Sequence, residues 1–249
     1  TISYADSTFL RPATKVREGQ VTEFQYDSKH REILRRDAVG TTEQREISTS
    51  WNDQHHRQES MTRGDLKTEY FFDSVGRTIE IRHTDLATQQ VRSSTMEYCT
   101  AVDLPAGCPL EGLLRRMTDP KGEITEYEYH LSDSANGWFV AGDLKQVTNP
   151  AGHAVEYLEY DAAGRPLRTS DANGVVTTRA YDARGRIETI ETAGATTHYA
   201  YRADGVVERI TQPDGSYLDF EYDTARRVVA VENALGERME YMLDDAGNL

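Results

Sequence analysis

The residues of this chain that could do chemistry are its two cysteines, its seven histidines and a series of aspartates that precede glycines. Cys99 and Cys108 lie at the two ends of one loop and could close a disulfide or pack as reduced thiols, and the sequence leaves both alternatives open. A zinc site is disfavoured because no histidine lies near the pair. The adjacent His55 and His56 would point to opposite faces of a strand, so we do not expect them to bind one ligand.

The segments in which aspartate is followed three residues later by glycine share some residues with calcium-binding loops. Calcium requires six to eight oxygen ligands from closely spaced residues, and these segments lack such a cluster. Serine and histidine occur without a nucleophile elbow or a glycine-rich phosphate loop. We therefore expect no metal, no cofactor and no catalytic centre in this chain.

The same aspartates belong to a regular repeat. Its motif is Tyr-Asp-x-x-Gly-Arg, and successive copies begin at Tyr160, Tyr181, Tyr201, Tyr222 and Leu243, which lie 21, 20, 21 and 21 residues apart. A period this regular indicates an array in which each unit buries its apolar surface against its neighbours. The motif residues to which we assign a structural role are Tyr160, Asp161, Gly164, Arg165, Tyr181, Asp182, Gly185, Arg186, Tyr201, Gly205, Tyr222 and Asp223.

A second turn signal falls halfway through each period. It has a turn-forming residue first and glycine fourth, at 149–152, 171–174, 212–215 and 233–236. Asp or Asn bonds its own backbone, and glycine accepts positive φ, so we expect type I turns with a glycine bulge. The chain then reverses every ten or eleven residues, leaving runs of about six or seven residues, an ordinary strand length.

Within these runs, side chains alternate with a period of two. The third, fifth and seventh residues after each half-repeat glycine are rich in threonine and aromatics, whereas the residues between them are largely polar and acidic. This predicts half-buried antiparallel strands with ladders of Tyr and Phe rings across neighbours. After Gly152 the tyrosine at 160 arrives one residue late, which predicts a β-bulge near Leu158 and Glu159.

The fold class that follows is all-β, a curved antiparallel ribbon of hairpins. We expect one continuous array over 1–249, with irregular repeats and loop insertions in 1–142 and regular repeats in 143–249. The insertion Leu131–Gly142 is interpreted as an extended hairpin or flap. About two dozen strands result, and a sheet that wide curls because its strands twist.

Composition excludes several classes of function. The net charge is −14, with 28% charged and 37% hydrophobic residues, which argues against binding of nucleic acid or anionic membranes. No apolar run reaches the length of a membrane span. The chain begins at Thr1 without a signal segment and stops midway through a repeat, so we expect a piece of a longer protein. Its cut strand edges predict self-association.

The motifs at Tyr160 and Tyr181, alternating with Gly-x-x-Thr-x-x-x-Tyr, closely resemble the YD repeats of the Rhs family. That family includes bacterial polymorphic toxins, many delivered by type VI secretion, the C component of insecticidal toxin complexes, and animal teneurins. The stretch Gly107–Leu114 is more similar to bacterial effector Rhs cores than to teneurins.

The resemblance implies that the ribbon is part of a hollow Rhs shell around a C-terminal toxin domain, in a bacterial effector secreted for interbacterial competition. Implied partners are the enclosed toxin domain, neighbouring shell repeats, and secretion-apparatus or adaptor proteins. Family members release the toxin by self-cleavage at a DPxG-type motif near the end of the core. Residues 119–122 have these letters but lie mid-array and fit the ordinary turn, so no catalytic residue is assigned and this segment is not expected to be an enzyme.

An alternative is a cell-surface adhesion or carbohydrate-binding β-solenoid that uses its aromatic rows to stack on sugars. It requires several rings to be exposed on one concave surface, whereas a wall requires them to pack. The discriminating residues are Tyr127, Tyr157, Tyr199 and Phe220.

Overall fold

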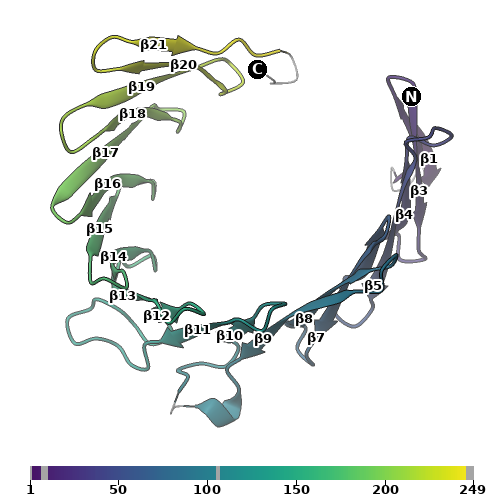
Figure 1. Ribbon diagram of the computed structural model, residues 1–249, viewed down its shortest axis with the longest axis horizontal. Coiled ribbons are helices and arrows are strands. Elements are labelled where there is room, and N and C mark those ends of the chain that lie inside the picture. The colour runs from purple at the N-terminus through teal and green to yellow at the C-terminus, as the bar shows by residue number, and fades with distance from the viewer. Residues whose placement is uncertain (1, 7–10, 105–106, 245–249) are drawn as a thin grey trace. The chain divides into compact units, whose positions relative to one another are not determined.

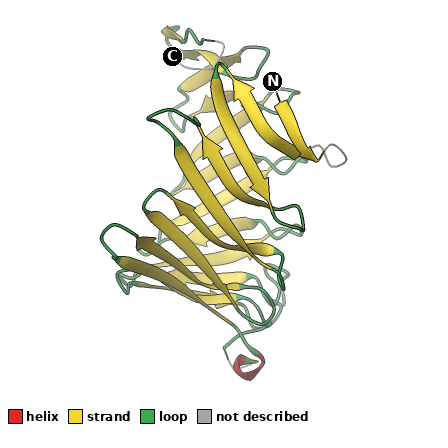
Figure 2. Cartoon of the chain, turned by 90° about the vertical axis from the view of Figure 1, so that its right-hand side faces the viewer, coloured by secondary structure: helices red, strands yellow, loops and turns green. Residues whose placement is uncertain are grey.

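The structure, a computed structural model, describes residues 2–6, 11–104 and 107–244. Nearly all regular structure in these residues is β-strand, with one short 3₁₀ helix at Ala101–Asp103 (Figures 1 and 2). The predicted all-β fold built from antiparallel hairpins is therefore confirmed.

The described strands divide between two compact units, residues 1–99 with 112–126 and residues 100–111 with 127–249. The first unit holds β1 (Ile2–Asp6), β2 (Arg11–Arg17), β3 (Gln20–Tyr26), β4 (Glu32–Asp37), β5 (Arg45–Asn52), β6 (Arg57–Arg63), β7 (Leu66–Phe72), β8 (Thr78–Asp85), β9 (Val91–Tyr98), β10 (Leu114–Thr118) and the first residues of β11 (Ile124–Tyr129). The second holds β12 (Leu144–Thr148), β13 (Ala154–Tyr160), β14 (Pro166–Ser170), β15 (Val176–Tyr181), β16 (Ile187–Thr192), β17 (Ala195–Tyr201), β18 (Val207–Thr211), β19 (Tyr217–Tyr222), β20 (Val228–Asn233) and β21 (Arg238–Glu240).

Within each unit the strands form a meander, in which every strand pairs antiparallel with the strand before it and the strand after it along the chain. Figure 1 shows that the sheet of each unit is curved and not flat. Strand twist explains this curvature, because successive strands rotate against each other.

The half-repeat turns have the predicted geometry. In one of them, Gly174 N donates to the Asp171 carbonyl oxygen at 2.9 Å, and Asp171 N donates to Val175 O at 3.0 Å. The Asp171 carboxylate accepts the N–H groups of Asn173 and Val175, both at 2.9 Å. Gly174 has φ of +79°, the left-handed conformation that glycine adopts most easily. Aspartate and glycine together therefore fix where each strand ends.

Burial alternates along some strands as predicted, but the core is thin. In β11, Thr125, Tyr127 and Tyr129 are half-buried, whereas Ile124, Glu126 and Glu128 are exposed. The fully buried side chains among the described residues are Cys99, Cys108, Ala230, Thr68 and Thr169. Contacts among half-buried side chains must therefore hold the strands together.

The bulge predicted near Leu158 is confirmed. Tyr157 pairs with Thr169, and Glu159 pairs with Arg168, so Leu158 is an extra residue on β13. This insertion absorbs the one-residue delay and returns Tyr160 to the position that Tyr181 occupies in the next repeat.

One local prediction is wrong, and of a second, the insertion predicted as an extended hairpin or flap, only the flap remains. His55 and His56 lie in the turn between β5 and β6, where His56 has φ of +52°, so the argument from opposite faces of a strand does not apply. The insertion Leu131–Gly142 contains no strand. The insertion folds back on itself, and the ring centroids of His130 and Phe139 lie 3.5 Å apart. Its backbone hydrogen bonds are mostly local, and Tyr160 N donates to the Trp138 carbonyl oxygen at 2.7 Å.

Both cysteines are disulfide-bonded, and neither is a free thiol. In the loop that follows Cys99, the backbone and side chain of Thr100 both donate to the Asp103 carboxylate at 2.7 Å, which caps the short helix. The loop end bearing Leu110 lies against Gly142, where an added Cβ would be 3.1 Å from Leu110 Cδ1.

Candidate functional site

The motif aspartate organises the turn and also fixes the motif arginine. The Asp182 Oδ1 atom accepts the backbone N–H groups of Arg184 and Arg186 at 2.9 Å. Its Oδ2 atom accepts Arg186 Nε at 2.8 Å and Nη2 at 2.6 Å. Because two donors of the guanidinium fork meet one carboxylate, the arginine has little freedom to rotate. The same arrangement links Asp161 to Arg165, Asp223 to Arg227, Asp27 to Arg31 and Asp73 to Arg77.

Four of these five guanidinium groups extend to the ring that begins the next motif, whereas the motif after Arg227 begins with Leu243 and has no ring. Arg186 Cζ lies 4.1 Å from the centroid of the Tyr201 ring, and Arg165 Cζ lies 4.4 Å from that of Tyr181. Cations placed this close to a ring face are attracted by its quadrupole. The Nη1 atom of Arg186 is buried without a conventional hydrogen bond, and the neighbouring ring, a weak acceptor, accounts for that.

The tyrosine hydroxyl completes the connection. Tyr201 donates to the carbonyl oxygen of Ile187 at 2.8 Å, and Ile187 directly follows the arginine that stacks on its ring. Equivalent bonds, from 2.6 to 3.1 Å, join Tyr160 to Leu144, Tyr181 to Pro166, Tyr222 to Val207 and Tyr98 to Thr78. We call the Asp–Arg pair of one repeat, together with the tyrosine of the next, the repeat clasp.

The motif glycine leaves space for this clasp. Gly185 has φ of +81°, and a Cβ at that position would lie 2.6 Å from Nη1 of Arg165, the arginine of the preceding repeat. Gly205 is the equivalent neighbour of Arg186 Nη1, at 3.9 Å. Gly174, in a half-repeat turn, has similar φ but nothing within 4 Å. Gly185 thus serves both backbone conformation and packing, whereas Gly174, like the motif glycine Gly164, serves only the first.

The predicted ladders of stacked rings are replaced by alternating rings and guanidinium groups. Tyr157 and Tyr160 stack with centroids 6.3 Å apart, but both lie on β13. Between repeats, arginine separates the rings. The motif at Tyr201 has Arg202 in place of aspartate, and this side chain pairs with Asp204 at 3.4 Å and lies 5.9 Å from the Tyr222 centroid. A looser contact of the same kind therefore persists where the motif changes.

The electrostatics of the clasp favour fixed charges at neutral pH. Hydrogen bonds from Arg186 lower the pKa of Asp182, and those from Arg165 lower the pKa of Asp161. The pKa of Asp223 is lowered, chiefly by the backbone N–H of Arg227. Burial raises the pKa of Tyr201 and, more strongly, that of Tyr160. These shifts keep the aspartates ionised and the tyrosines protonated, which is the state the clasp requires.

Metal ligands, membrane-spanning helices and exposed aromatic rings would each indicate a particular function. Among the described residues, no group of three or more His, Cys, Asp or Glu side chains could hold a metal ion. In the same part of the chain, no helix is long and apolar enough to span a membrane. The four discriminating rings, Tyr127, Tyr157, Tyr199 and Phe220, are all half-buried and not exposed.

Sequence reasoning missed the early clasps in the first unit. Arg31 Cζ lies 5.6 Å from the Trp51 ring, and Trp51 Nε1 donates to Glu32 O at 2.8 Å, so tryptophan takes the place of tyrosine. Arg77 Cζ lies 4.8 Å from the Tyr98 ring. The available signal was the Asp–Arg spacing of four residues at Asp27 and Asp73, which the blurred repeat between them obscured.

Comparison with known proteins places this architecture. The family model of the RHS Repeat matches residues 140–176 and 160–198, which contain the clasp of Asp161, Arg165 and Tyr181. Residues 140–198 therefore carry repeats of the Rhs (YD-repeat) type. The chain is 38% identical over 90 residues to Double-stranded DNA deaminase toxin A of Burkholderia cenocepacia (strain H111). The aligned region covers 36% of the chain and 6% of that protein.

Solved structures share the fold. The crystal structure of TcdB2-TccC3 matches 92% of this chain with a TM-score of 0.62 and 16% identity, over 13% of that chain. The crystal structure of TcdB2-TccC3-Cdc42 matches 89% with a TM-score of 0.59 and 16% identity, over 12% of that chain. This chain therefore spans a small fraction of the length of the proteins it matches.

The two roles of glycine predict different costs for two similar substitutions. Gly174→Ala should lower the free energy of unfolding by about 1 kcal/mol, because alanine is strained at positive φ. Gly185→Ala should cost about 1 kcal/mol more, because the new methyl group displaces an arginine held by Asp161 and Tyr181. Urea denaturation of both variants measures the difference in the free energy of unfolding. Equal losses would show that Arg165 moves aside without loss of stability and would contradict a packing role for Gly185.

The tyrosine hydroxyl can be tested with a matched pair on one strand. Tyr201→Phe removes the bond to Ile187 O and should lower the free energy of unfolding by about 1 kcal/mol. Tyr199 makes no hydrogen bond through its hydroxyl, so Tyr199→Phe should be nearly neutral. Thermal denaturation followed by circular dichroism compares the two, and a neutral Tyr201→Phe would contradict a structural role for that bond.

The depressed aspartate pKa values predict acid sensitivity. A carboxyl whose pKa is lower in the folded than in the unfolded chain contributes stability above the unfolded value of about 3.9 and loses it as the pH falls through the folded value. The melting temperature should therefore fall between about pH 5 and pH 3. Asp182→Asn should melt lower at pH 7 and show a smaller fall, whereas Glu188→Gln, at an exposed and unpaired carboxylate, should follow the wild type. Parallel curves for Asp182→Asn and the wild type would refute this assignment.

Proposed function

We propose that this segment is part of the wall of a hollow Rhs shell that encloses a toxin domain of the same polypeptide. The observation that carries the proposal is the repeat clasp. The motif Asp, Arg and Tyr side chains, which are able to bind ligands, are instead bonded to one another across neighbouring repeats. They therefore join the strands into a continuous wall. Such a partition suits a container better than a reaction centre.

The relatives support a toxin-associated role. One is named a deaminase toxin, and the fold is that of a part of TcdB2-TccC3. On this proposal the segment itself is not an enzyme, and any toxin chemistry lies elsewhere in the full-length protein. The protein is a secreted bacterial effector that acts in interbacterial competition, is made in the cytoplasm and leaves by a specialised secretion system, with secretion-apparatus or adaptor proteins as further partners.

Half-burial of the aromatic rings disfavours the adhesion alternative. Stacking on a sugar requires an accessible ring face, yet Tyr127, Tyr157, Tyr199 and Phe220 are packed among strand neighbours. Rings of the clasp are covered further, because a guanidinium lies on Tyr181 and Tyr201. The aromatic rows are therefore assigned to packing within the wall.

Protease protection in the full-length protein tests the proposal. Limited proteolysis followed by mass spectrometry should leave the C-terminal domain intact in the wild type, because the shell excludes the protease. Arg165→Ala combined with Arg186→Ala should expose that domain by weakening two clasps. Lys121→Ala with Arg226→Ala, at two exposed turn residues whose side chains make no bond among the described residues, is the matched control and should retain protection. Cleavage of the domain in the intact wild type would rule out enclosure.

A further inference from the structure

Strand register places a row of basic side chains on one face of the first unit. The pairs Lys15–Thr22, Asp37–Arg45, Ile47–Arg63 and His83–Arg92 lie directly opposite each other across neighbouring strands. Because paired and alternate residues share a face, five basic residues lie on the face that also carries Phe24, Trp51 and Tyr70, near the half-repeat turns. We call them the basic row: Lys15, Arg17, Arg45, Arg63 and Arg92.

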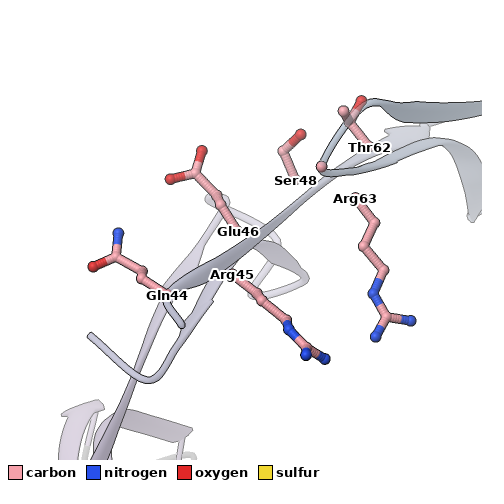
Figure 3. Close-up of a pocket in the computed structure, with 7 residues that line it drawn as sticks. Gln44, Arg45, Glu46, Ser48, Thr62 and Arg63 are labelled. Carbon is pink, nitrogen blue, oxygen red and sulfur yellow. The ribbon is translucent and has the colours of Figure 1, made fainter. Parts of the chain in front are cut away.

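The close-up in Figure 3 agrees with this placement. The side chains of Arg45 and Arg63 extend to one side of the sheet, whereas Glu46, Ser48 and Thr62 point to the other. Arg45 and Arg63 thus share one face, whereas Glu46 lies on the other, where it accepts from Arg36.

The fold leaves these charges largely unused. All five side chains are exposed. Arg17 has a carboxylate neighbour, Glu18, at 3.7 Å, with both side chains more than 80% exposed. Within the described residues, Lys15, Arg45 and Arg63 have no ion-pair partner, whereas Arg35 on the same face is bonded to Asp37 at 3.2 Å. Unpaired cations concentrated on one edge are unexpected in a chain with a net charge of −14.

Shallow hollows lie beside the row on the same face. They are lined by Lys15, Arg17, Glu18, Gln20 and Thr22, by Gln20, Asp37, Ala38, Glu43, Arg45, Ile47 and Arg63, and by Leu66, His83, Asp85, Gln90 and Arg92, so each also holds at least one carboxylate. Each hollow places at least one cation beside a hydroxyl, amide or apolar group. That mixture suits the side chains of a polypeptide.

The repeat itself does not require these charges. In the second unit, register places uncharged residues at the corresponding edge of the aromatic face. They are Thr177, Thr192, Thr197, Ile210, Leu218 and Met239. The basic row is therefore a local property of the first unit, superimposed on a sheet that folds without it elsewhere.

We infer that the basic row binds an acidic polypeptide segment. Guanidinium groups match carboxylates in a two-point geometry. Neighbouring strands lie about 4.8 Å apart. Arg45 and Arg63 form a diagonal pair on β5 and β6, since Arg63 is opposite Ile47, so they are about 8 Å apart. The other cations of the row lie three strands away on either side, about 14 Å. Asp37 and Asp85 lie within this pattern. Such uneven spacing suits discrete Asp and Glu residues better than the dense phosphates of nucleic acid. The inference is independent of the wall function.

Fluorescence anisotropy with a labelled decapeptide of alternating Glu and Ala tests the inference on the 249-residue chain at low ionic strength. Arg45→Glu with Arg63→Glu should weaken binding about tenfold, because two exposed ion pairs are lost and replaced by repulsion. Lys121→Glu with Arg226→Glu changes the net charge equally at exposed turns outside the row and should change affinity less than about twofold. Circular dichroism verifies folding, and Arg45→Gln with Arg63→Gln replaces the first variant if it misfolds.

Three results would overturn the inference. They are the absence of saturable peptide binding to the wild type, equal losses in the row variant and the control, and tighter binding of a labelled single-stranded oligodeoxynucleotide through Arg45 and Arg63. The last would identify a nucleic-acid surface in place of a peptide surface.

Discussion

A guanidinium held by one repeat and laid on the ring of the next is the interaction on which this structure depends. The sheet is one layer thick, and few of its side chains are fully buried, so it cannot rely on a packed interior. In a repeat array, stability is a sum of terms within units and terms between neighbours. The clasp supplies the second term through one carboxylate, one arginine and one tyrosine per period, because it combines charge, ring contact and a backbone hydrogen bond at one place.

Two populations of basic residues follow from this arrangement. The clasp arginines are half-buried, bonded to aspartate and committed to the fold, as for Arg31 and Arg186, whose side chains are 19% and 26% exposed. The basic row is exposed, unevenly spaced and confined to the first unit. Net charge hides this division, because it counts both populations together. An acidic chain can therefore present a local basic edge.

Turn chemistry and alternation were sufficient to predict the all-β fold, the turns and the bulge at Leu158, because each depends on residues close in sequence. The contacts between repeats were harder to predict. The pattern places Arg165 and Tyr181 near one end of the sheet but does not say that the guanidinium covers the ring. Trp51 occupies a motif position in the sequence, but the pattern does not say that its ring takes the place of tyrosine beside Arg31. The basic row required register, since Arg45 and Arg63 become neighbours only after Ile47 is paired across the strands.

Insertions were the other weak point. The 131–142 segment lacks the repeat, and its shape depends on a His130–Phe139 stack and on a bond between Trp138 and Tyr160 that no periodicity encodes. His55 and His56 were misplaced because the longer turn between β5 and β6 departs from the four-residue template.

The central claim, that stacking between repeats is energetically coupled, is tested most directly by a double-mutant cycle on Arg186 and Tyr201. Unfolding free energies of Arg186→Ala, Tyr201→Leu and the double variant would be measured by urea denaturation of the same chain. The account predicts a coupling energy of about 1 kcal/mol, with the double variant less destabilised than the sum of the single variants. Strictly additive losses would mean that the arginine and the ring act separately, and would contradict the clasp as the link between repeats.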